Sequence, residues 1–405
     1  MITMAIDNKD KKVLKSSIER EQNEVACSAE CEKIKGSKNL NVPHLRFPEF
    51  SGEWKKCIIQ DYGEVITGNT PPTNNAEYYN NGSYLWASPA DLGTGKKIND
   101  TKTKLSESGF KKTRIIPKGS ILVTCIGSTI GKIGMAVETM SSNQQINSII
   151  VNEKSNNDFV YYAISRAFPR YLSEVGVQAV PILSKSNFEK LPNYTTSIEE
   201  QDKTGYFLNL LDERIATQNK IIDKLQSLIK GIAQNIVSNN KPNIRLSDCL
   251  DCSSSTLQES DVCETGIYPV YGANGIVGYL DNYNTEGEAV YIIKDGSGVG
   301  TVSYATGKCS ATGTLNTLQA KDGYSLQYLY YILKVFNFEP YKTGMAIPHI
   351  YFKDYGKAKI FCPSYTEQLR YARLQSAIDS KLSVEKNILT SLSSQKQYLL
   401  RQMFI

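Results

Sequence analysis

Apolar residues in the middle of the chain recur at alternating spacings of three and four, which is the pattern of a helix with one buried seam. The seam is interrupted once, at Gln218, and residues 198–237 contain no proline and only two glycines. We therefore predict one long helix in this region. Its seam positions are Leu208, Leu211, Ile215, Ile222, Leu225, Ile229, Ile232 and Ile236.

A weaker version of the same pattern ends the chain. Three polar residues, Gln375, Glu385 and Lys396, interrupt it. We expect this second helix to pack less tightly than the first, or to use these residues against partner subunits. Its seam positions are Ile378, Leu382, Leu389, Leu392, Leu399 and Met403.

Ordinary surface helices packed on a globular core would show similar seams, but the length of the first helix argues against this reading. About 40 helical residues at 1.5 Å each reach roughly 60 Å, which exceeds the span of a small domain, so we predict a spacer. The first helix leaves one globule and enters the next, while the second must return along it, so the two helices should be antiparallel. Such a pair has a pseudo-twofold axis and can bind two copies of one partner.

The chain is an internal repeat. A shift of 169 positions superposes three segments of similar sequence in one register, namely 127–133 on 296–302, 146–149 on 315–318 and 159–162 on 328–331. A shift of 167 then superposes Glu200 and Gln201 on Glu367 and Gln368. Several matches in one register indicate two copies of one module.

A globular module precedes each helix. Short β-like runs such as 120–126 and 289–293 are separated by Gly, Asn and Pro, which predicts mixed α/β globules. Residues 1–40 alternate Lys with Glu and contain no aromatic residue, so we expect a mobile or marginally helical extension there. The expected division is a charged extension at 1–40, modules at 41–195 and 241–363, and helical regions at 196–240 and 364–405.

The composition is that of an ordinary globular protein of more than one domain, with 405 residues, 40% of them hydrophobic and 21% charged. The sequence has no signal-peptide pattern at its start and no apolar stretch near the roughly 18 residues that span a bilayer. We therefore expect a cytoplasmic protein without a membrane partner. Nine cysteines, an odd number, favour free thiols over disulfides in such a chain.

No catalytic or metal-binding set emerges from the sequence. The two histidines, His44 and His349, do not stand at zinc-finger spacing from the cysteine pairs at 249/252 and 27/31. The glycine-rich segment 295–300 has Thr301 where a dinucleotide-binding fingerprint needs its last glycine, and the next residues alternate like a strand. We predict hairpin turns here and at 127–131, and we expect neither a cofactor nor an activity of the chain's own.

Positive charge gathers at residues 96–118, where eight Lys and Arg stand against two acidic residues, a net +6 compared with +5 for the whole chain. A solvated surface would explain this charge, but the intervening Thr, Ser and Asn also suit hydrogen bonds to DNA phosphates and base edges. The second module has a thinner basic set among tyrosines. Our candidate DNA-binding residues are Asn69, Thr70, Thr73, Lys96, Lys97, Lys111, Lys112 and Arg114 in the first module, and Asn274, Lys294, Ser297 and Lys342 in the second.

Residues 41–54, with the sequence NVPHLRFPEFSGEW, resemble the opening of specificity subunits of bacterial type I restriction-modification systems. Segments 68–71, 267–275 and 397–404 and the two Glu-Gln helix starts resemble the same family, so the resemblance runs from about residue 41 to the end. It implies two target-recognition domains, each reading one half of a split, asymmetric site in double-stranded DNA. It also implies that the helical regions dock two methyltransferase subunits, and that a restriction and translocase subunit joins the larger assembly.

Two other functions remain open at this point. A scaffold whose modules bind proteins would use the helices as an assembly platform and would lack salt-sensitive binding to duplex DNA. A self-contained adenine methyltransferase would use the segment 296–300 to bind adenosylmethionine in the isolated chain.

Overall fold

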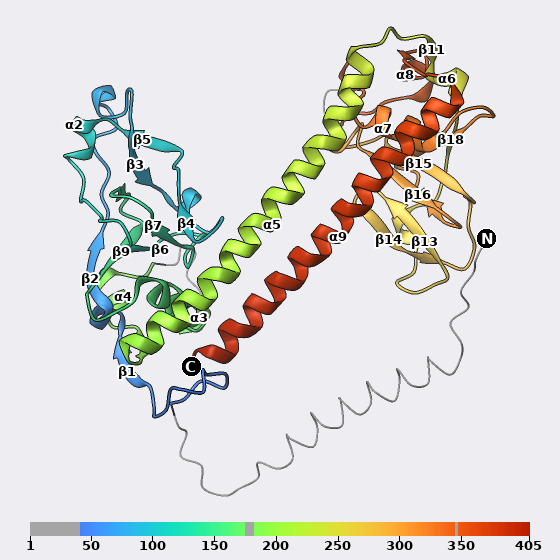
Figure 1. Cartoon of the computed structure of the whole chain (residues 1–405). Coiled ribbons are helices and arrows are strands. Elements are labelled where there is room, and N and C mark those ends of the chain that lie inside the picture. The colour runs from blue at the N-terminus through green and yellow to red at the C-terminus, as the bar shows by residue number, and fades with distance from the viewer. Residues whose placement is uncertain (1–40, 175–181, 345–346) are drawn as a thin grey trace, which may run out of the picture. The chain divides into compact units, whose positions relative to one another are not determined.

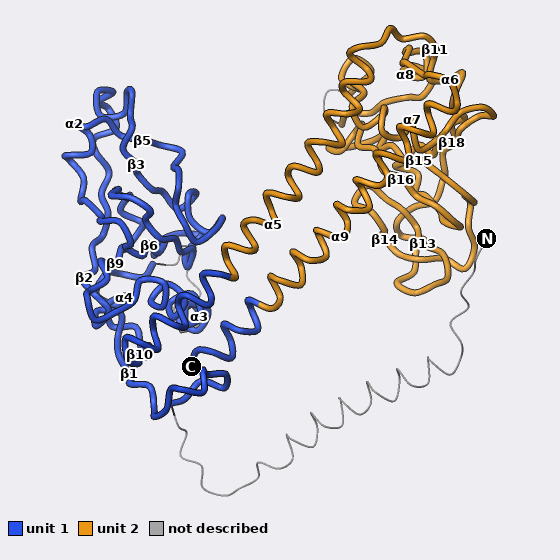
Figure 2. The backbone as a smooth tube through the Cα atoms, in the orientation of Figure 1, with its two compact units in different colours: residues 1–210, 396–405 blue, residues 211–395 orange. Residues whose placement is uncertain are grey.

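The computed structural model of the chain describes residues 41–174, 182–344 and 347–405, which form two compact units (Figure 1, Figure 2). Unit 1 takes the chain up to Leu210 and the residues from Lys396 onward, and unit 2 is Leu211–Gln395. Helices α5 (Ile198–Ser238) and α9 (Tyr365–Met403) each begin in one unit and end in the other. The extension predicted at 1–40 lies outside the described residues.

Both long helices therefore form within two residues of the bounds expected for the helical regions, 196–240 and 364–405. The units divide the chain inside these helices, whereas the sequence-based division placed the boundaries at their ends.

Unit 1 is a mixed α/β module built on a five-stranded sheet. Its elements are β1 (Lys55–Ile58), η1 (Ile59–Tyr62), β2 (Gly63–Thr67), η2 (Ala76–Tyr78), β3 (Tyr84–Ala87), η3 (Pro89–Asp91), β4 (Lys97–Ile98), β5 (Thr103–Leu105), α2 (Glu107–Phe110), β6 (Ile121–Thr124), β7 (Ile133–Ala136), β8 (Ser141–Ser142), β9 (Ile146–Val151), α3 (Asn157–Glu174), α4 (Lys185–Glu189) and β10 (Pro192–Thr195). The main sheet has the order β2-β9-β6-β7-β4, with β4 parallel to β7 and the other neighbours antiparallel. Two small sheets, β5-β3-β8 and β1-β10, complete the unit.

Unit 2 repeats this plan. Its elements are β11 (Ile244–Arg245), α6 (Leu246–Cys249), β12 (Leu250–Ser254), η4 (Glu259–Asp261), β13 (Tyr268–Gly272), β14 (Gly275–Leu280), β15 (Glu288–Ile293), β16 (Val302–Thr306), β17 (Ser310–Ala311), β18 (Leu315–Ala320), α7 (Leu326–Leu333), η5 (Glu339–Tyr341), α8 (Phe352–Tyr355) and β19 (Lys359–Ile360). The order β12-β18-β15-β16 matches β2-β9-β6-β7, and the parallel pair β13–β17 matches β3–β8. The repeat found in the sequence is therefore a repeat of fold.

Strand β6 shows why the centre of unit 1 reads as a continuous apolar run. Ile121 and Val123 belong to one buried cluster, with Phe159 of α3, while Leu122 belongs to another, with Ile98 of β4. Successive side chains of a strand point to opposite faces, so a strand covered on both faces must be apolar throughout.

A buried glutamine near the start of each long helix connects that helix to its module by hydrogen bonds. Gln201 accepts a hydrogen bond from the main-chain N–H of Asn156 (3.0 Å), and Gln368 accepts one from Ser325 (2.9 Å). In both copies the amide Nε2 donates to the carbonyl oxygen five residues earlier, at 2.8 and 2.9 Å. The shared Glu-Gln pair of the sequence therefore includes one residue with the same structural role in both modules.

Within unit 2, α5 and α9 pair antiparallel, as predicted. Gln218 donates to the main-chain oxygen of Glu385 (3.0 Å) and to its carboxylate, and Gln375 donates to the carbonyl of Ile229 (3.2 Å). All the predicted seam positions are buried or half-buried. Gln218 and Glu385 are equivalent positions of the repeat, 167 residues apart, so the pseudo-twofold axis of the helix pair passes through this contact.

Two of the three polar residues of the second seam face α5, so the alternative that they contact partner subunits is wrong for these two. Gln375 and Glu385 occupy seam positions and are only 0% and 6% exposed. Each finds a hydrogen-bond partner on α5, which is the condition under which a polar group is tolerated in a buried seam.

Both glycine-rich segments are hairpin turns, as predicted. The first joins the antiparallel strands β6 and β7, and the second joins β15 and β16. Gly127 and Gly296 have φ of +99° and +93°, a backbone conformation that favours glycine.

Candidate nucleic-acid interface

The two modules differ in the segment that joins the first strand of the shared sheet, β2 or β12, to the next strand of that sheet along the chain, β6 or β15. This insert is residues 68–120 in unit 1, where it carries β3, β4, β5 and α2, and residues 255–287 in unit 2, where it carries β13 and β14. The unit 1 insert has eight basic and four acidic residues, whereas the unit 2 insert has five acidic residues and no Lys or Arg. The same frame therefore holds inserts of opposite charge, net +4 and −5.

Four candidate residues of unit 1 lie in or beside one hydrogen-bonded patch. Asn69 donates to the carbonyl of Lys112 (2.9 Å) and accepts from the main-chain N–H of Arg114 (2.7 Å). Thr70 donates to the side chain of Gln144 (2.6 Å). Both ends of the Asn69 amide are therefore engaged, so this residue orders the basic loop. The side chains of Lys112 and Arg114 are exposed, and the guanidinium of Arg114 also donates to the carbonyl of Thr67 (2.6 Å).

Lys96 does not belong to that surface, contrary to its assignment from the sequence. Its side chain is 3% exposed, forms an ion pair with Asp158 (2.5 Å) and donates to Asn209 (2.9 Å). A buried, paired ammonium stabilises the fold and is not available to a DNA phosphate. Sequence reasoning counted its charge with its neighbours because the ion pair joins residues 62 positions apart.

The other basic residues of the segment are more exposed. Lys111 pairs with Glu107 (2.6 Å) on the short helix α2, with both side chains mostly in solvent, a contact of little energetic weight. Lys97, on the short strand β4, and Thr73 are also exposed.

In unit 2 three candidates gather near the tip of the β15–β16 hairpin. Lys294 and Ser297 lie on the turn itself. Lys342 precedes Thr343, whose main chain pairs with that of His349, and His349 in turn pairs with Asp295 of the turn. Asn274 lies elsewhere, exposed at the tip of the β13–β14 hairpin. The structure thus places Lys294 and Ser297 on one hairpin and Asn274 on another, while Lys342 follows η5.

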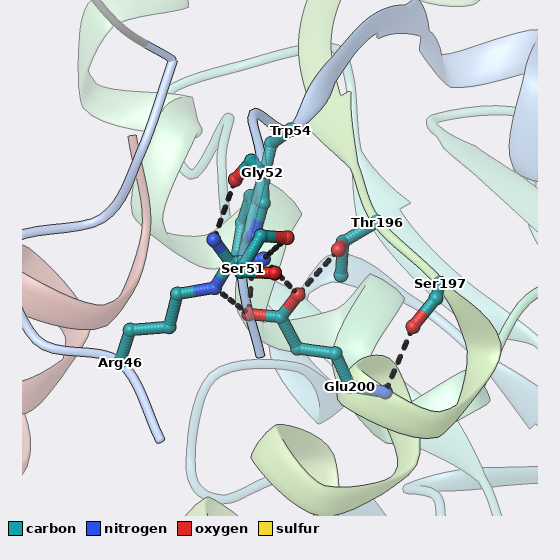
Figure 3. Close-up of polar contacts among 7 residues, drawn as sticks. All are labelled: Arg46, Ser51, Gly52, Trp54, Thr196, Ser197 and Glu200. Atoms are coloured by element: carbon teal, nitrogen blue, oxygen red, sulfur yellow. Dashed lines mark hydrogen bonds and ion pairs between the residues drawn. The ribbon is translucent and has the colours of Figure 1, made fainter. Parts of the chain in front are cut away.

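Sequence reasoning missed a polar clamp that involves the segment 41–54 (Figure 3). Glu200, 2% exposed at the start of α5, accepts two hydrogen bonds from Arg46 (both 2.7 Å) and one from the indole of Trp54 (3.2 Å). The hydroxyl of Thr196 also donates to it. Burial raises the pKa of Glu200, but the hydrogen bonds from Arg46, Thr196 and Trp54 outweigh it and hold the pKa below its usual range.

The clamp is a structural contact. The carboxylate of Glu200 is saturated with donors, and Arg46 also donates to the carbonyls of Gly52 (2.5 Å) and Ser51 (3.1 Å). The cavity beside it, about 290 Å³, is lined by four of these residues and by four neighbours, namely Phe50, Glu53, Lys55 and Ser197. Glu367, the repeat counterpart of Glu200, is exposed, so the clamp is particular to unit 1.

Residues 41–174, 182–344 and 347–405 contain no cluster of three or more His, Cys, Asp or Glu able to bind a metal. In that same part of the chain, no helix has the length and apolar character to cross a membrane. Seven cysteines lie in it as free thiols. Cys27 and Cys31 are outside the described residues.

The family model of the type I restriction modification DNA specificity domain matches the chain twice, at residues 51–227 and 242–394. The specificity subunit of the type I restriction enzyme MjaIX from Methanocaldococcus jannaschii is 30% identical over 182 residues, which are 43% of this chain and 42% of that protein. The EcoprrI specificity subunit from Escherichia coli is 22% identical over 358 residues, 77% of this chain and 84% of that protein. The alignment thus spans less than half of the first of these relatives.

Among solved structures, the S subunit of the type I restriction-modification system from M. genitalium is similar to this chain, with a TM-score of 0.65 and 19% identity. The similarity covers 90% of this chain and 99% of that one. At this level of identity the likeness concerns the fold, which is the two-module α/β arrangement with two long helices.

Proposed function

The chain belongs to the type I restriction modification DNA specificity family, and from this we propose that it selects the DNA sequence at which its partner subunits act. Each module reads one half of a split, asymmetric site in double-stranded DNA. The observation that carries the proposal is the repeated frame with unequal inserts, 68–120 and 255–287. The shared sheet holds the insert of each module at an equivalent place. Because the two inserts differ in length, fold and charge, each module recognises a different DNA sequence.

We propose different DNA contacts for the two modules. In unit 1 the exposed Lys112 and Arg114 bind phosphates, together with their neighbour Lys111. Thr73 and Lys97 are further exposed candidates, and Lys97 lies on β4, at the other edge of the main sheet from β2. In unit 2 the acidic insert repels phosphates, so phosphate binding falls to Lys294 and Lys342 of the frame, and Asn274 and Ser297 are the candidate base readers. Carboxylates of that insert suit the cytosine N4 amino group, which is a donor in the major groove.

We propose that the helices dock two methyltransferase subunits, and that a restriction and translocase subunit joins them in the cytoplasm. The support is apolar surface at equivalent positions of the repeat. Ile221 on α5 and Ile388 on α9 are each 37% exposed and lie 167 residues apart, the offset of the repeat. Leu228 and Val384, 49% and 51% exposed, extend the two patches along their helices. Exposed apolar side chains grouped in this way mark interaction sites.

We propose that the chain is not itself catalytic and that the partners carry out the chemistry. The test is the methylome of a host that expresses the methyltransferase subunit with and without this chain. A split, asymmetric methylated site that appears only with the chain supports the proposal. Methylation that is independent of the chain contradicts it and favours the protein-binding scaffold.

A further inference from the structure

Unit 1 contains a second cavity, of about 420 Å³, between α3 and the last turns of α9. Its lining is cationic. Arg166 comes from α3, and Lys396 and Arg401 come from α9. Tyr161 and Tyr162, which carry hydroxyl groups, also line it, as do Ser165, Pro169, Gln397 and Leu400. None of the residues that line it is Asp or Glu.

The positive charge of the pair Arg166 and Arg401 is not balanced by the described part of the protein. Among the described residues, neither side chain forms an ion pair, and the buried Nε of Arg166 has no hydrogen-bond partner. Burial lowers the pKa of Arg166, and the nearby charges of Arg170 and Arg401 lower it further. Arg170 donates to the terminal main-chain oxygen of Ile405 (2.8 Å). A buried donor left without a partner carries a desolvation penalty that a bound anion would remove.

The fold does not need this cluster, as comparison of the two modules shows. The counterpart of α3 is α7, which ends at Leu333, so Arg166 and Arg170 lie in a part of α3 that has no helical counterpart. The 167-residue register places Ile229 and Gln234 of α5 at the positions of Lys396 and Arg401. Unit 2 therefore folds on the same plan without these cations.

The chemistry of the cavity selects an oxyanion with more than one charge. Tyr161 and Tyr162 are 7% and 0% exposed, so neither ring offers a free face on which a base could stack. Guanidinium groups bind phosphate and carboxylate oxygens through paired hydrogen bonds. A partner's carboxylate brings one charge, whereas a DNA strand brings one phosphate about every 3.4 Å along its axis. Two or three clustered cations therefore fit a nucleic-acid backbone best.

We propose that this cavity binds the phosphate backbone of DNA, as a sequence-independent contact on the helical part of unit 1. This inference rests on the proposed function, since it supposes that the chain binds DNA. Arg166 and Arg401 bind the phosphate oxygens, and they add to affinity without affecting which bases are read.

The test uses the full chain in complex with its methyltransferase subunits and duplexes with and without the methylated site. Each lost phosphate contact lowers the slope of log K against log salt by about 0.9. We expect the double variant Arg166→Gln/Arg401→Gln to lower the slope by one to two units on both duplexes, with the methylated sequence unchanged. Arg166→Lys/Arg401→Lys, which keeps the charge, should retain most of the slope. Arg373→Gln, an exposed arginine of α9, is the matched control and should leave the slope unchanged.

Three results would overturn the proposal. If Arg166→Gln/Arg401→Gln has the same slope as the control and melts like the wild-type protein, these arginines do not contact DNA phosphates. Loss of the methyltransferase subunits from the complex, with the slope unchanged, assigns the cavity to a partner's carboxylate. Saturable binding of inorganic phosphate to the wild-type chain, with no change in slope, assigns it to a small phosphate ligand. Failure of the proposed function is distinguishable from all three, because the wild-type complex would then show no preference between the duplexes.

Discussion

The clamp around Glu200 allows a matched test, because the repeat supplies an exposed counterpart, Glu367. Glu200→Gln removes the negative charge that holds Arg46 and keeps the size of the side chain. Removing one partner from a buried ion pair costs about 3–5 kcal/mol. We expect the lower end, about 3 kcal/mol, because Arg46 is 13% exposed and keeps two carbonyl partners. Glu367→Gln should change stability by no more than about 0.5 kcal/mol.

Tryptophan fluorescence during urea unfolding is the natural assay for this comparison. The chain has two tryptophans, Trp54 and Trp86, and both lie in unit 1, so the signal reports that unit. The control residue Glu367 lies in unit 2, so far-ultraviolet circular dichroism, which follows the helices of both units, is recorded alongside it. Trp54 is 2% exposed and donates to Glu200 itself. A loss below about 1 kcal/mol in Glu200→Gln, or an equal loss in Glu367→Gln, would refute the reasoning.

The ion pair of Arg46 and Glu200 also predicts that the stability of unit 1 depends on pH. The pKa of Glu200 is lower in the folded protein than in the unfolded chain, so its stabilising contribution is complete above the unfolded pKa. That contribution is lost as pH falls through the lowered folded pKa. The difference in stability between wild type and Glu200→Gln should therefore be full at neutral pH and shrink in acid. A difference that grows as pH falls would contradict the assigned direction.

Three further predictions concern the interface and the helices. Arg114→Gln should lower the salt slope of DNA binding by about 0.9, whereas Lys96→Gln should lower the urea midpoint and leave the slope unchanged. Gln218→Leu alone should destabilise the helix pair, and Gln218→Leu with Glu385→Leu should restore stability in a double-mutant cycle, because the seam then becomes apolar throughout. Ile221→Asp should reduce copurification of the methyltransferase subunit without changing the thermal melt, and a melt that falls instead would show that the residue supports the fold.

The long helices and the repeat could be predicted from the sequence because their signals are local or periodic. A seam such as 208–236 needs only the spacing of apolar residues, and the register of the repeat needs only identity at a fixed shift. The hairpin turns followed from glycines in one short segment. Each of these features depends on residues that are close in sequence or related by a nearly constant offset.

The polar contacts could not be predicted in this way, because each joins residues far apart in the chain. From the sequence alone Lys96 is one more cation of a basic segment, and only the fold shows that it pairs with Asp158. From the sequence alone Glu385 interrupts the seam, and only the fold shows that it accepts a hydrogen bond from Gln218. Arg46 and Glu200, 154 positions apart, show no signal that would pair them. The charge of each of these residues is known from its type, whereas its ion-pair or hydrogen-bond partner is known only from the fold.

Exchange of the insert 68–120 for the corresponding insert of a family member with another DNA specificity is the decisive measurement. The frame, the helices and the second insert stay as they are, and the methylome of the host reports the site. We predict that one half of the split site changes, while the other half and the length of the gap are retained. A site that changes in both halves, or in neither, would contradict the assignment of one reader to each module.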